Sequence, residues 1–285
     1  MPPLLWGFVL GTKQPVTVMT NKSNEQLIIT SPDNRTFKAL CRLSDARGLK
    51  KQGRTLVAGA KLVREFALER PGECCSLIVF DGFQGLGMQD VVQQFAGQGK
   101  LTVLKKGLFN ELDIFNTGAP LLEVKVPTVP AWDGKLAGHG CVLLVPFQDP
   151  ANVGAVARSA AAFGVRQVVL LREAASPFHP KSVRASGGAV FRLSFFRGPA
   201  LAEVVHMPDV ARHIVALDMQ GQSILQVSLP SQFLLLAGIE GQGLPEELRR
   251  QAVSIPMTGQ VESLNAATAV SIALFCWSVG QRISK

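Results

Sequence analysis

The chain has little charge and few of the residues that hold metals or form redox centres. Only 18% of its 285 residues are charged, whereas 47% are hydrophobic. This balance argues against a disordered chain and supplies enough apolar surface for a sizeable core. The five cysteines form no C-x-x-C pair, and the four histidines are scattered. The sequence therefore predicts reduced thiols, as in a cytoplasmic protein, and no metal site.

A signal peptide and a membrane span are also not expected. The apolar run within the first ten residues is short, and no basic residue precedes it. Residues 263–281 carry no charge and nearly reach the length of a membrane span. Ser, Asn, Thr and Gln interrupt this run, however, and nothing anchors its start. We expect a buried core or interface helix there.

Acidic residues are scarce, so the net charge is +8. This charge indicates an anionic partner, with nucleic acid as the first candidate and plain solubility as the alternative. Between residues 35 and 54 only one acid, Asp45, accompanies seven basic residues, which favours phosphate contacts over a merely solvated helix face. These basic residues are Arg35, Lys38, Arg42, Arg47, Lys50, Lys51 and Arg54.

The order of apolar and polar segments predicts two α/β domains. An extension, 1–26, precedes a first domain, 27–126, in which strands alternate with helices as in a small three-layer α/β unit. Residues 127–140 hold two prolines and three glycines and are typical of a linker. The second domain, 141–285, opens with an unbroken apolar run, as expected for a parallel sheet covered on both faces. We expect a basic helix over roughly 34–50 and a strand over 189–195.

A first polar loop follows the strand that begins at Cys141. Asp149 and Pro150 turn the chain, and Asn152 is expected to cap the next helix. Gly154 and several alanines leave this helix bare, so that another backbone can pack closely against it. Arg158 is the one long polar side chain in its first turns; an anion clamp is favoured over a surface or C-cap arginine.

Two further loops follow apolar runs near the carboxyl end. Glycines in the segment that starts at Gly238 have the spacing G-x-x-G-x-G, which is not the dinucleotide fingerprint but permits close approach to a flat ligand. Glu240, its one acid, fits a structural or an acid–base role. In the last loop Ser263 and Asn265 precede an apolar helix, whose free N–H groups suit a ligand. Because the carboxyl ends of parallel strands meet at one edge of a sheet, we expect the three loops to lie together.

Between the first two loops, Lys181, Arg184 and Ser186 form a modest phosphate-binding pattern. Together the segments resemble the SpoU/TrmH family of SPOUT RNA ribose methyltransferases, over residues 141–285. Arg184-Ala-Ser-Gly-Gly-Ala is similar to the family's segment between its first two motifs. The three motifs stand in order as Asn152-x-Gly154-x-x-x-Arg158, Gly238-x-Glu240-Gly-x-Gly243-Leu, and Ile255-Pro-Met with Ser263-Leu-Asn265. The first domain is similar, less specifically, to a ribosomal-protein-like substrate-binding domain, through residues 28–40 and 53–63.

The resemblance implies a trefoil-knotted parallel sheet, a homodimer, and transfer of a methyl group from S-adenosylmethionine to a ribose 2′-hydroxyl of RNA, with ribosomal RNA as the expected substrate. It implies main-chain cofactor contacts from Gly238, Ile255 and Leu264, with Met257 nearby. The family's catalytic arginine matches Arg158. Because arginine stays protonated, we expect this side chain to clamp a phosphate and stabilise the developing alkoxide rather than act as a base. The other catalytic candidates implied by the resemblance are Asn152, Glu240, Ser263 and Asn265.

Several alternatives stay open at this point. Transfer RNA could be the substrate in place of ribosomal RNA. A non-catalytic RNA-binding factor for ribosome assembly could keep the same fold. A nucleotide-dependent oxidoreductase would need the standard glycine fingerprint, which this chain lacks. A base-directed methyltransferase on a related knotted fold would be expected to place an acid where this chain has an arginine.

Overall fold

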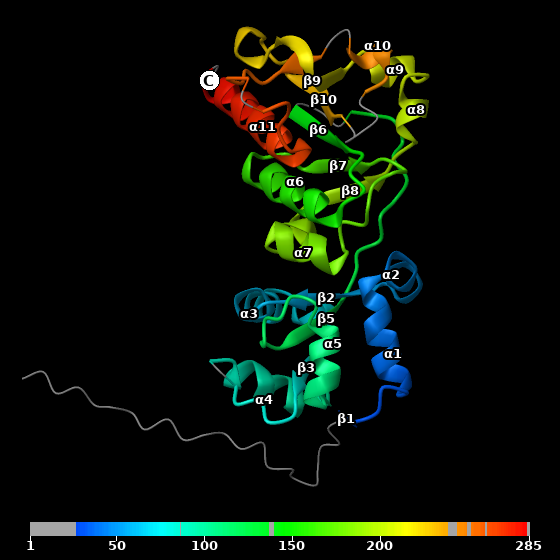
Figure 1. Cartoon of the computed structure of the whole chain (residues 1–285), viewed down its shortest axis with the longest axis vertical. Coiled ribbons are helices and arrows are strands. Elements are labelled where there is room, and N and C mark those ends of the chain that lie inside the picture. Colours follow the sequence, from blue (N-terminus) through cyan, green and yellow to red (C-terminus); the bar gives the residue numbers. More distant parts are fainter. Residues whose placement is uncertain are drawn as a thin grey trace, which may run out of the picture.

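The computed structural model shows two lobes, each built around its own sheet and stacked one above the other (Figure 1). It describes residues 27–85, 87–136, 140–238, 244–249, 252–259 and 261–283. The expectations for the extension 1–26, for Glu240 and for Gly243 lie outside the described residues.

The first lobe contains a five-stranded sheet in the order β1-β4-β3-β5-β2. Strands β1, β4 and β3 are parallel, whereas β5 pairs antiparallel with both β3 and β2. Its strands are β1 (Leu27–Ile29), β2 (Arg54–Ala58), β3 (Cys74–Phe80), β4 (Leu101–Leu104) and β5 (Leu121–Lys125). Its helices are α1 (Arg35–Cys41), η1 (Arg42–Ser44), α2 (Ala46–Gln52), α3 (Ala60–Glu69), η2 (Pro71–Glu73), α4 (Gln89–Gly97) and α5 (Lys106–Leu112).

The basic helix expected over roughly 34–50 is in fact two helices, α1 and α2, joined by the 3-10 turn η1. Asn34 caps α1 by accepting the backbone N–H groups of residues 36 and 37. Asp45 then starts α2 by accepting the Gly48 N–H. Gly53 ends α2 in the left-handed region, with φ of 60°, where a glycine is favoured. Because η1 separates α1 from α2, the basic residues of this segment are distributed over two short helices and the turn between them.

The second lobe contains a six-stranded sheet in the order β11-β9-β10-β6-β7-β8, in which every described pair is parallel. This confirms the predicted parallel α/β architecture, while the knot and the domain boundaries stay predictions. Its strands are β6 (Gly140–Val145), β7 (Gln167–Leu170), β8 (Ser194–Arg197), β9 (Ile214–Ser223), β10 (Gln232–Ala237) and β11 (Val253–Ser254). Its helices are α6 (Pro150–Ala162), α7 (Pro180–Ser186), η3 (Ala189–Arg192), α8 (Leu201–Val204), α9 (Pro208–Ala211), η4 (Ile224–Gln226), α10 (Glu246–Arg249) and α11 (Ala266–Ile283).

Helices α6 and α11 run side by side on one face of the second sheet (Figure 1). Ser159 meets Ser271 through a 2.7 Å hydroxyl–hydroxyl hydrogen bond, and the rings of Phe163 and Phe275 pack edge to face at 6.0 Å. The uncharged segment near the carboxyl end is thus a core helix, as expected. Among the described helices, none is long and apolar enough to cross a membrane.

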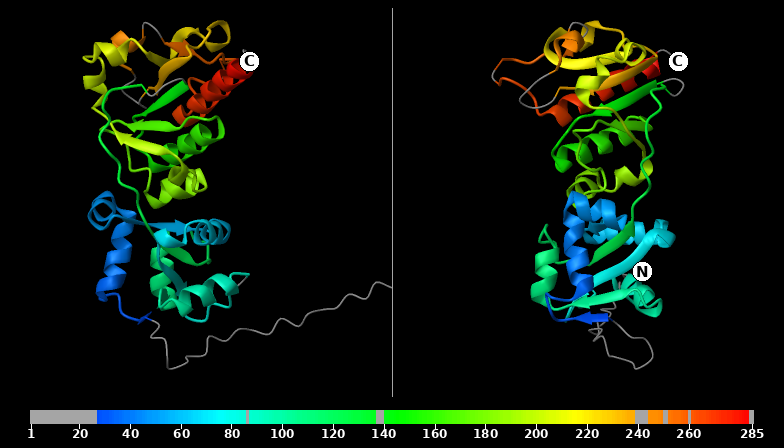
Figure 2. Two further views of the ribbon diagram at one scale, coloured as in Figure 1. Left: turned by 180° about the vertical axis from the view of Figure 1, so that it is seen from behind. Right: turned by 90° about the vertical axis from the view of Figure 1, so that its right-hand side faces the viewer.

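The lobes share part of their core. One hydrophobic cluster includes Phe66 of α3 and Leu77 of β3 from the first lobe, together with Phe178, Phe191 and Leu143 from the second. Helix α7 lies at the end of the second lobe that faces the first, as both views in Figure 2 show. The two lobes therefore pack against each other through buried side chains as well as being joined by the chain.

Candidate functional site

The first motif lies at the start of α6, directly after β6. Asp149, not Asn152, caps this helix: its carboxylate accepts the Ala151 N–H at 2.9 Å. Pro150 occupies the first helical position, which requires no N–H donor there. The expectation that Asn152 is the cap is therefore wrong, and its side chain makes a different contact.

That contact joins the first motif to the third. Asn265 caps α11 by accepting the backbone N–H groups of Ala267 at 3.0 Å and Thr268 at 3.2 Å through Oδ1. Its Nδ2 donates to Asn152 Oδ1 at 3.2 Å. One amide thus orders the start of α11 and fixes it to the start of α6. The first and third loops lie together at the carboxyl edge of the sheet, as expected.

Arg158 lies one to two turns further along α6, and its side chain is exposed. The neighbouring Ser159 faces α11. Gly154 faces α7, where an added Cβ would overlap the Ser182 carbonyl oxygen and come within 2.8 Å of Ala185 Cβ. The close backbone approach predicted for Gly154 is confirmed. Since two faces of α6 are covered, the guanidinium projects from an exposed part of a tightly fixed helix.

The residues expected to contact the cofactor follow β10 and β11. Gly238 comes directly after β10, and Ile255 directly after β11, where its side chain is half-buried against the core. Met257 is 37% exposed. Leu264 is half-buried and Ser263 is exposed just before α11. The segment between β11 and α11 thus carries these three apolar side chains, and Gly238 lies at the end of a different strand.

Three basic residues of the first lobe surround a surface hollow of about 500 Å³ around α2. Arg42, Arg47 and Lys51 line it together with Asp45, whose carboxylate already accepts the Gly48 N–H. Ser44, directly before the lining residue Asp45, contacts the second lobe, because its carbonyl oxygen lies 2.9 Å from His179 Nε2 at the start of α7.

Other predicted RNA-binding residues differ in their surroundings. Arg35 and Lys50 are exposed, and Lys38 forms an exposed ion pair with Asp33 at 2.7 Å. The carboxyl pKa of Asp33 is lowered by this hydrogen bond to Lys38. Arg54 instead pairs at 3.0 Å with Glu123, whose side chain is only 9% exposed, and this hydrogen bond raises the pKa of the arginine. Arg54 thus compensates a buried carboxylate.

The cluster expected on α7 is also divided. Lys181 is exposed. The Arg184 guanidinium lies over the Phe115 ring at 4.7 Å, so it bridges the two lobes. Ser186 is 2% exposed and its hydroxyl donates to the Val183 carbonyl oxygen at 2.9 Å. This corrects the expectation for Ser186, because its hydroxyl is satisfied inside the fold and faces no solvent.

The model of the SpoU rRNA Methylase family matches residues 140–275. An uncharacterised tRNA/rRNA methyltransferase of Synechocystis sp. is 30% identical over 268 residues, which cover 87% of this chain and 92% of the relative. The chain belongs to the SpoU family.

Two other relatives share only part of their length with this chain. A ribosomal RNA small subunit methyltransferase G 2 of Syntrophobacter fumaroxidans is 44% identical over 254 residues, 88% of this chain. A 23S rRNA uridine 2′-O-methyltransferase of Streptomyces viridochromogenes is 37% identical over 146 residues, 48% of this chain. The chain spans about half the length of these two relatives, 49% and 50%.

A solved SpoU structure has the same fold. The SpoU methyltransferase AviRb of Streptomyces viridochromogenes, in complex with AdoMet, superposes with a TM-score of 0.70 at 27% identity and covers 88% of this chain and 99% of that one. The likeness thus extends over the smaller amino-terminal lobe as well as the SpoU domain. All three motifs lie within the matched segment 140–275.

Sequence reasoning missed His179 and Thr55 in this SpoU chain. His179 caps α7: its Nδ1 accepts the Lys181 N–H at 3.1 Å while Nε2 meets the Ser44 carbonyl oxygen. The pair His179-Pro180 before a helix was a signal for such a cap. Thr55 Oγ1 donates to the Phe178 carbonyl oxygen at 2.6 Å and so connects the two lobes. No local sequence pattern predicts this contact.

Proposed function

We propose that the chain transfers a methyl group from S-adenosylmethionine (AdoMet) to a ribose 2′-hydroxyl of RNA, with ribosomal RNA as the expected substrate. The observation that carries the proposal is the hydrogen bond between Asn265 and Asn152, which joins the first and third SpoU motifs. Arg158 is exposed on the same helix as Asn152. The 2′-O-methyltransferase among the relatives supports ribose as the acceptor.

The residues that follow β10 and β11 fit AdoMet chemically. Half-buried Ile255 and Leu264 and the exposed thioether of Met257 offer apolar contacts for a flat adenine ring. The main chain at Gly238, Ile255 and Leu264 supplies hydrogen-bonding groups. When bound, AdoMet would supply an electrophilic methyl group attached to a positively charged sulfonium, and this charge is lost when the methyl group is transferred. A pocket with few charged groups therefore suits the reaction.

Arg158 is the side chain of this protein that we propose takes part directly in methyl transfer. A guanidinium stays protonated in proteins and cannot take the proton of a ribose hydroxyl. It can bind an RNA phosphate next to the target ribose through a planar pair of N–H donors, and it can stabilise negative charge that develops on the 2′-oxygen. Asn152 and Asn265 hold the two loops in place, and Ser263 is exposed beside them. We propose that Glu240 links the loops of the site to one another.

The RNA surface that we propose is centred on the hollow around α2. Arg42, Arg47 and Lys51 concentrate positive charge there, and Lys50 lies on the same helix. Lys181, Arg35 and Lys38 extend the basic surface on α7 and α1. Arg54 and Ser186 are left out, because Glu123 neutralises the first and the fold buries the second. Such phosphate contacts predict binding that weakens steeply as salt rises.

We also propose a cytoplasmic homodimer. The face formed by α6 and α11 leaves Phe275 53% exposed beside the half-buried Phe163, which suits a second copy of the chain. Sedimentation of the purified chain would measure this. A monomer at micromolar concentration would contradict the proposal.

The position of the methyl group gives a direct test. Transcripts of ribosomal RNA and of transfer RNA are incubated with AdoMet that carries a tritiated methyl group, and are then hydrolysed in alkali. Alkaline cleavage needs a free 2′-hydroxyl, so ribose methylation leaves the label in alkali-resistant dinucleotides. Base methylation leaves it in mononucleotides. AdoMet binding measured by calorimetry without any transfer to either RNA would point to a non-catalytic RNA-binding factor instead.

The same assay tests Arg158. Replacing Arg158 by Ala should lower the rate of transfer roughly 10²–10³-fold, the usual cost of removing a group that stabilises developing charge. The affinity for AdoMet should stay unchanged in calorimetry. Arg166→Ala, another exposed arginine just beyond α6, is the matched control and should transfer at the wild-type rate. Transfer near the wild-type rate by Arg158→Ala would show that the assignment is wrong.

A further inference from the structure

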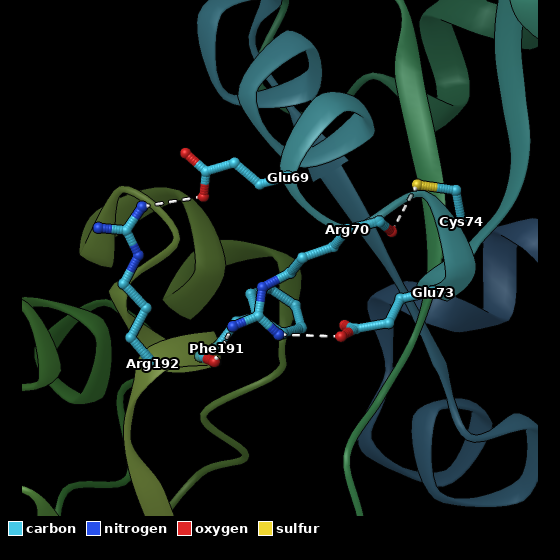
Figure 3. Close-up of polar contacts among 6 residues, drawn as sticks. All are labelled: Glu69, Arg70, Glu73, Cys74, Phe191 and Arg192. Atoms are coloured by element: carbon cyan, nitrogen blue, oxygen red, sulfur yellow. Dashed lines mark hydrogen bonds and ion pairs between the residues drawn. The ribbon is translucent and has the colours of Figure 1, made fainter.

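The segment 178–192 of the second lobe is hydrogen-bonded to the first lobe near both of its ends. At its beginning the Thr55 hydroxyl donates to the Phe178 carbonyl oxygen at 2.6 Å, and both residues are buried. At its end Arg70 Nη2 donates to the Phe191 carbonyl oxygen at 2.7 Å (Figure 3). These bonds join positions more than 120 residues apart in sequence. They hold the main chain of the segment rather than its side-chain tips.

Arg70 binds the Phe191 carbonyl oxygen in a fixed orientation. Its Nη1 pairs with Glu73 Oε1 at 2.9 Å, so the planar guanidinium binds two acceptors from two lobes (Figure 3). The guanidinium carbon lies 5.9 Å from the centre of the Phe66 ring, which in turn packs edge to face on Phe191 at 4.8 Å. The Arg70 and Glu73 side chains are 30% and 37% exposed. A guanidinium that donates to two acceptors and also lies over an aromatic ring has little freedom to move.

A second pair nearby is different. Arg192 meets Glu69 at 3.2 Å, but the side chains are 65% and 56% exposed (Figure 3). Exposed pairs of this kind contribute little, because solvent screens the charges and both side chains lose rotational freedom. Arg192 therefore offers a matched arginine in the same interface whose loss should change little.

The opposite side of the segment packs on α6. Gly154 touches the backbone of α7 at Ser182, and Ala185 leaves no room for even one added methyl group. Ser182 is fully buried and its hydroxyl donates to the Ser176 carbonyl oxygen at 2.9 Å. The segment is therefore sandwiched between the first lobe and the helix that carries Asn152 and Arg158. Closely packed interiors transmit a displacement rather than absorb it.

We propose that Arg70 and Thr55 are positioning residues for methyl transfer. By fixing both ends of the segment 178–192, they set where α6 presents Arg158 and Asn152. The first lobe is then part of the scaffold of the catalytic helix, in addition to binding RNA. The inference rests on the proposed function, because it concerns the alignment of that same site.

The kinetic test compares Arg70→Ala, Arg70→Lys and the control Arg192→Ala, with tritiated AdoMet and a ribosomal RNA transcript. Small misplacements at a reacting centre cost up to roughly 10²-fold in rate, so kcat of Arg70→Ala should fall by about 10–10²-fold. KM for RNA and the Kd for AdoMet should stay within about twofold, since neither ligand touches Arg70 in the proposal. Lys keeps the charge beside Glu73 but cannot bind both acceptors in one plane, so Arg70→Lys should recover part of the rate. Thr55→Val provides a second variant of nearly the same volume.

Amide hydrogen exchange supplies a readout that does not depend on activity. In Arg70→Ala, peptides from 150–162 should exchange several-fold faster than in the wild type, whereas Arg192→Ala should leave them unchanged. The inference is overturned if kcat of Arg70→Ala equals that of the wild type, or if exchange rises only within 178–192. If the wild-type chain transfers no methyl group, the proposed function fails, and the exchange experiment still decides whether the first lobe positions α6.

Discussion

At the scale of single residues, Asn265 combines two tasks in one amide group. Its Oδ1 accepts two N–H groups at the start of α11, and its Nδ2 donates to Asn152 on α6. The first contact belongs to the stability of a helix, because free N–H groups at a helix start need acceptors. The second belongs to the site, because it fixes the spacing of two loops. Substitution can separate these tasks.

The separation uses Ser and Ala at this position. Asn265→Ser keeps an oxygen that can cap α11 but is too short to reach Asn152, so stability should stay close to that of the wild type. Asn265→Ala loses the cap as well and should unfold with about 1 kcal/mol less free energy. Urea unfolding measures this difference. Methyl transfer should fall to a similar extent in both variants, and a fall confined to Asn265→Ala would assign the residue to stability alone.

Sequence patterns indicated where α11 begins, but they did not indicate the partners of the polar side chains. Asn265 begins a helix as the apolar run after it indicated. Asn152 was misjudged because Asp149, directly before Pro150, takes the cap first. Arg54 finds Glu123 only through the antiparallel pairing of β2 with β5, and this contact spans 69 positions in the sequence. No local charge pattern contains that information.

At the scale of elements, α6 is determined by what packs on it. Its small side chains, the alanines and Gly154, allow α7 to pack closely on one face of α6 and α11 on another. Glycine inside a helix costs about 0.5–1 kcal/mol relative to alanine, because it loses more backbone freedom on folding. The sequence keeps Gly154 there despite this cost. Contact with the backbone of α7 is the physical reason.

A pair of glycine substitutions should therefore have opposite effects. Gly154→Ala should lower the free energy of unfolding by about 1–3 kcal/mol, because the added methyl group overlaps α7 and forces it away. Gly107→Ala, in the exposed first turn of α5 with no heavy atom within 4 Å of the added Cβ, should raise it by up to about 1 kcal/mol. Chemical denaturation of both variants gives the comparison. Equal effects would mean that α6 and α7 pack less closely than described.

Helix α7 depends on a neutral histidine at its start. His179 Nδ1 accepts the Lys181 N–H, which leaves Nε2 to donate to the Ser44 carbonyl oxygen of the first lobe. Burial lowers the pKa of His179; the Ser44 contact and Asp149 oppose this shift, and the Lys181 charge adds to it. Protonation at Nδ1 would remove the acceptor and so remove the cap of α7.

Stability should accordingly fall in mild acid. Because the folded-state pKa is lowered, the unfolded chain binds more protons as the pH drops below the ordinary histidine value of about 6.5. The contribution of His179 is thus present above that pH and is lost as pH falls through the folded-state value. Thermal unfolding of the wild type and of His179→Gln, which does not titrate, should be compared at pH 7.5 and 5.5. The wild type should lose more stability over this interval; equal losses would exclude this histidine as the cause.

The sequence located most elements but misplaced those defined by turns. The parallel sheet of the second lobe follows from its unbroken apolar runs. The strand expected over 189–195 is wrong: Gly187 and Gly188 adopt positive φ angles, and Ala189–Arg192 form the 3-10 turn η3 before β8 begins at Ser194. Apolar content alone could not distinguish a buried turn from a strand.

At the scale of the whole molecule, the interface between the lobes was not foreseeable. A proline- and glycine-rich segment predicted two domains on a linker, and the sheets do divide the chain near it. Yet Phe66 and Val57 of the first lobe share one hydrophobic cluster with Phe178 and Phe191 of the second. Each of these side chains looks like ordinary core in its own segment. Only the fold shows that the two cores are continuous, and this continuity is the physical basis of the proposed coupling between the first lobe and α6.

A continuous core predicts that both lobes unfold together. Differential scanning calorimetry should give one transition whose calorimetric enthalpy equals the van't Hoff enthalpy. Unfolding absorbs about 0.7 kcal/mol per residue near 60 °C, so one transition of both lobes absorbs roughly twice the heat of one lobe alone. Thr55→Val leaves the buried Phe178 carbonyl oxygen without its donor and should lower the midpoint of that single transition. Two separate transitions in the wild type would mean that the lobes are independent, and the proposed coupling of Arg70 to α6 would then have no physical basis.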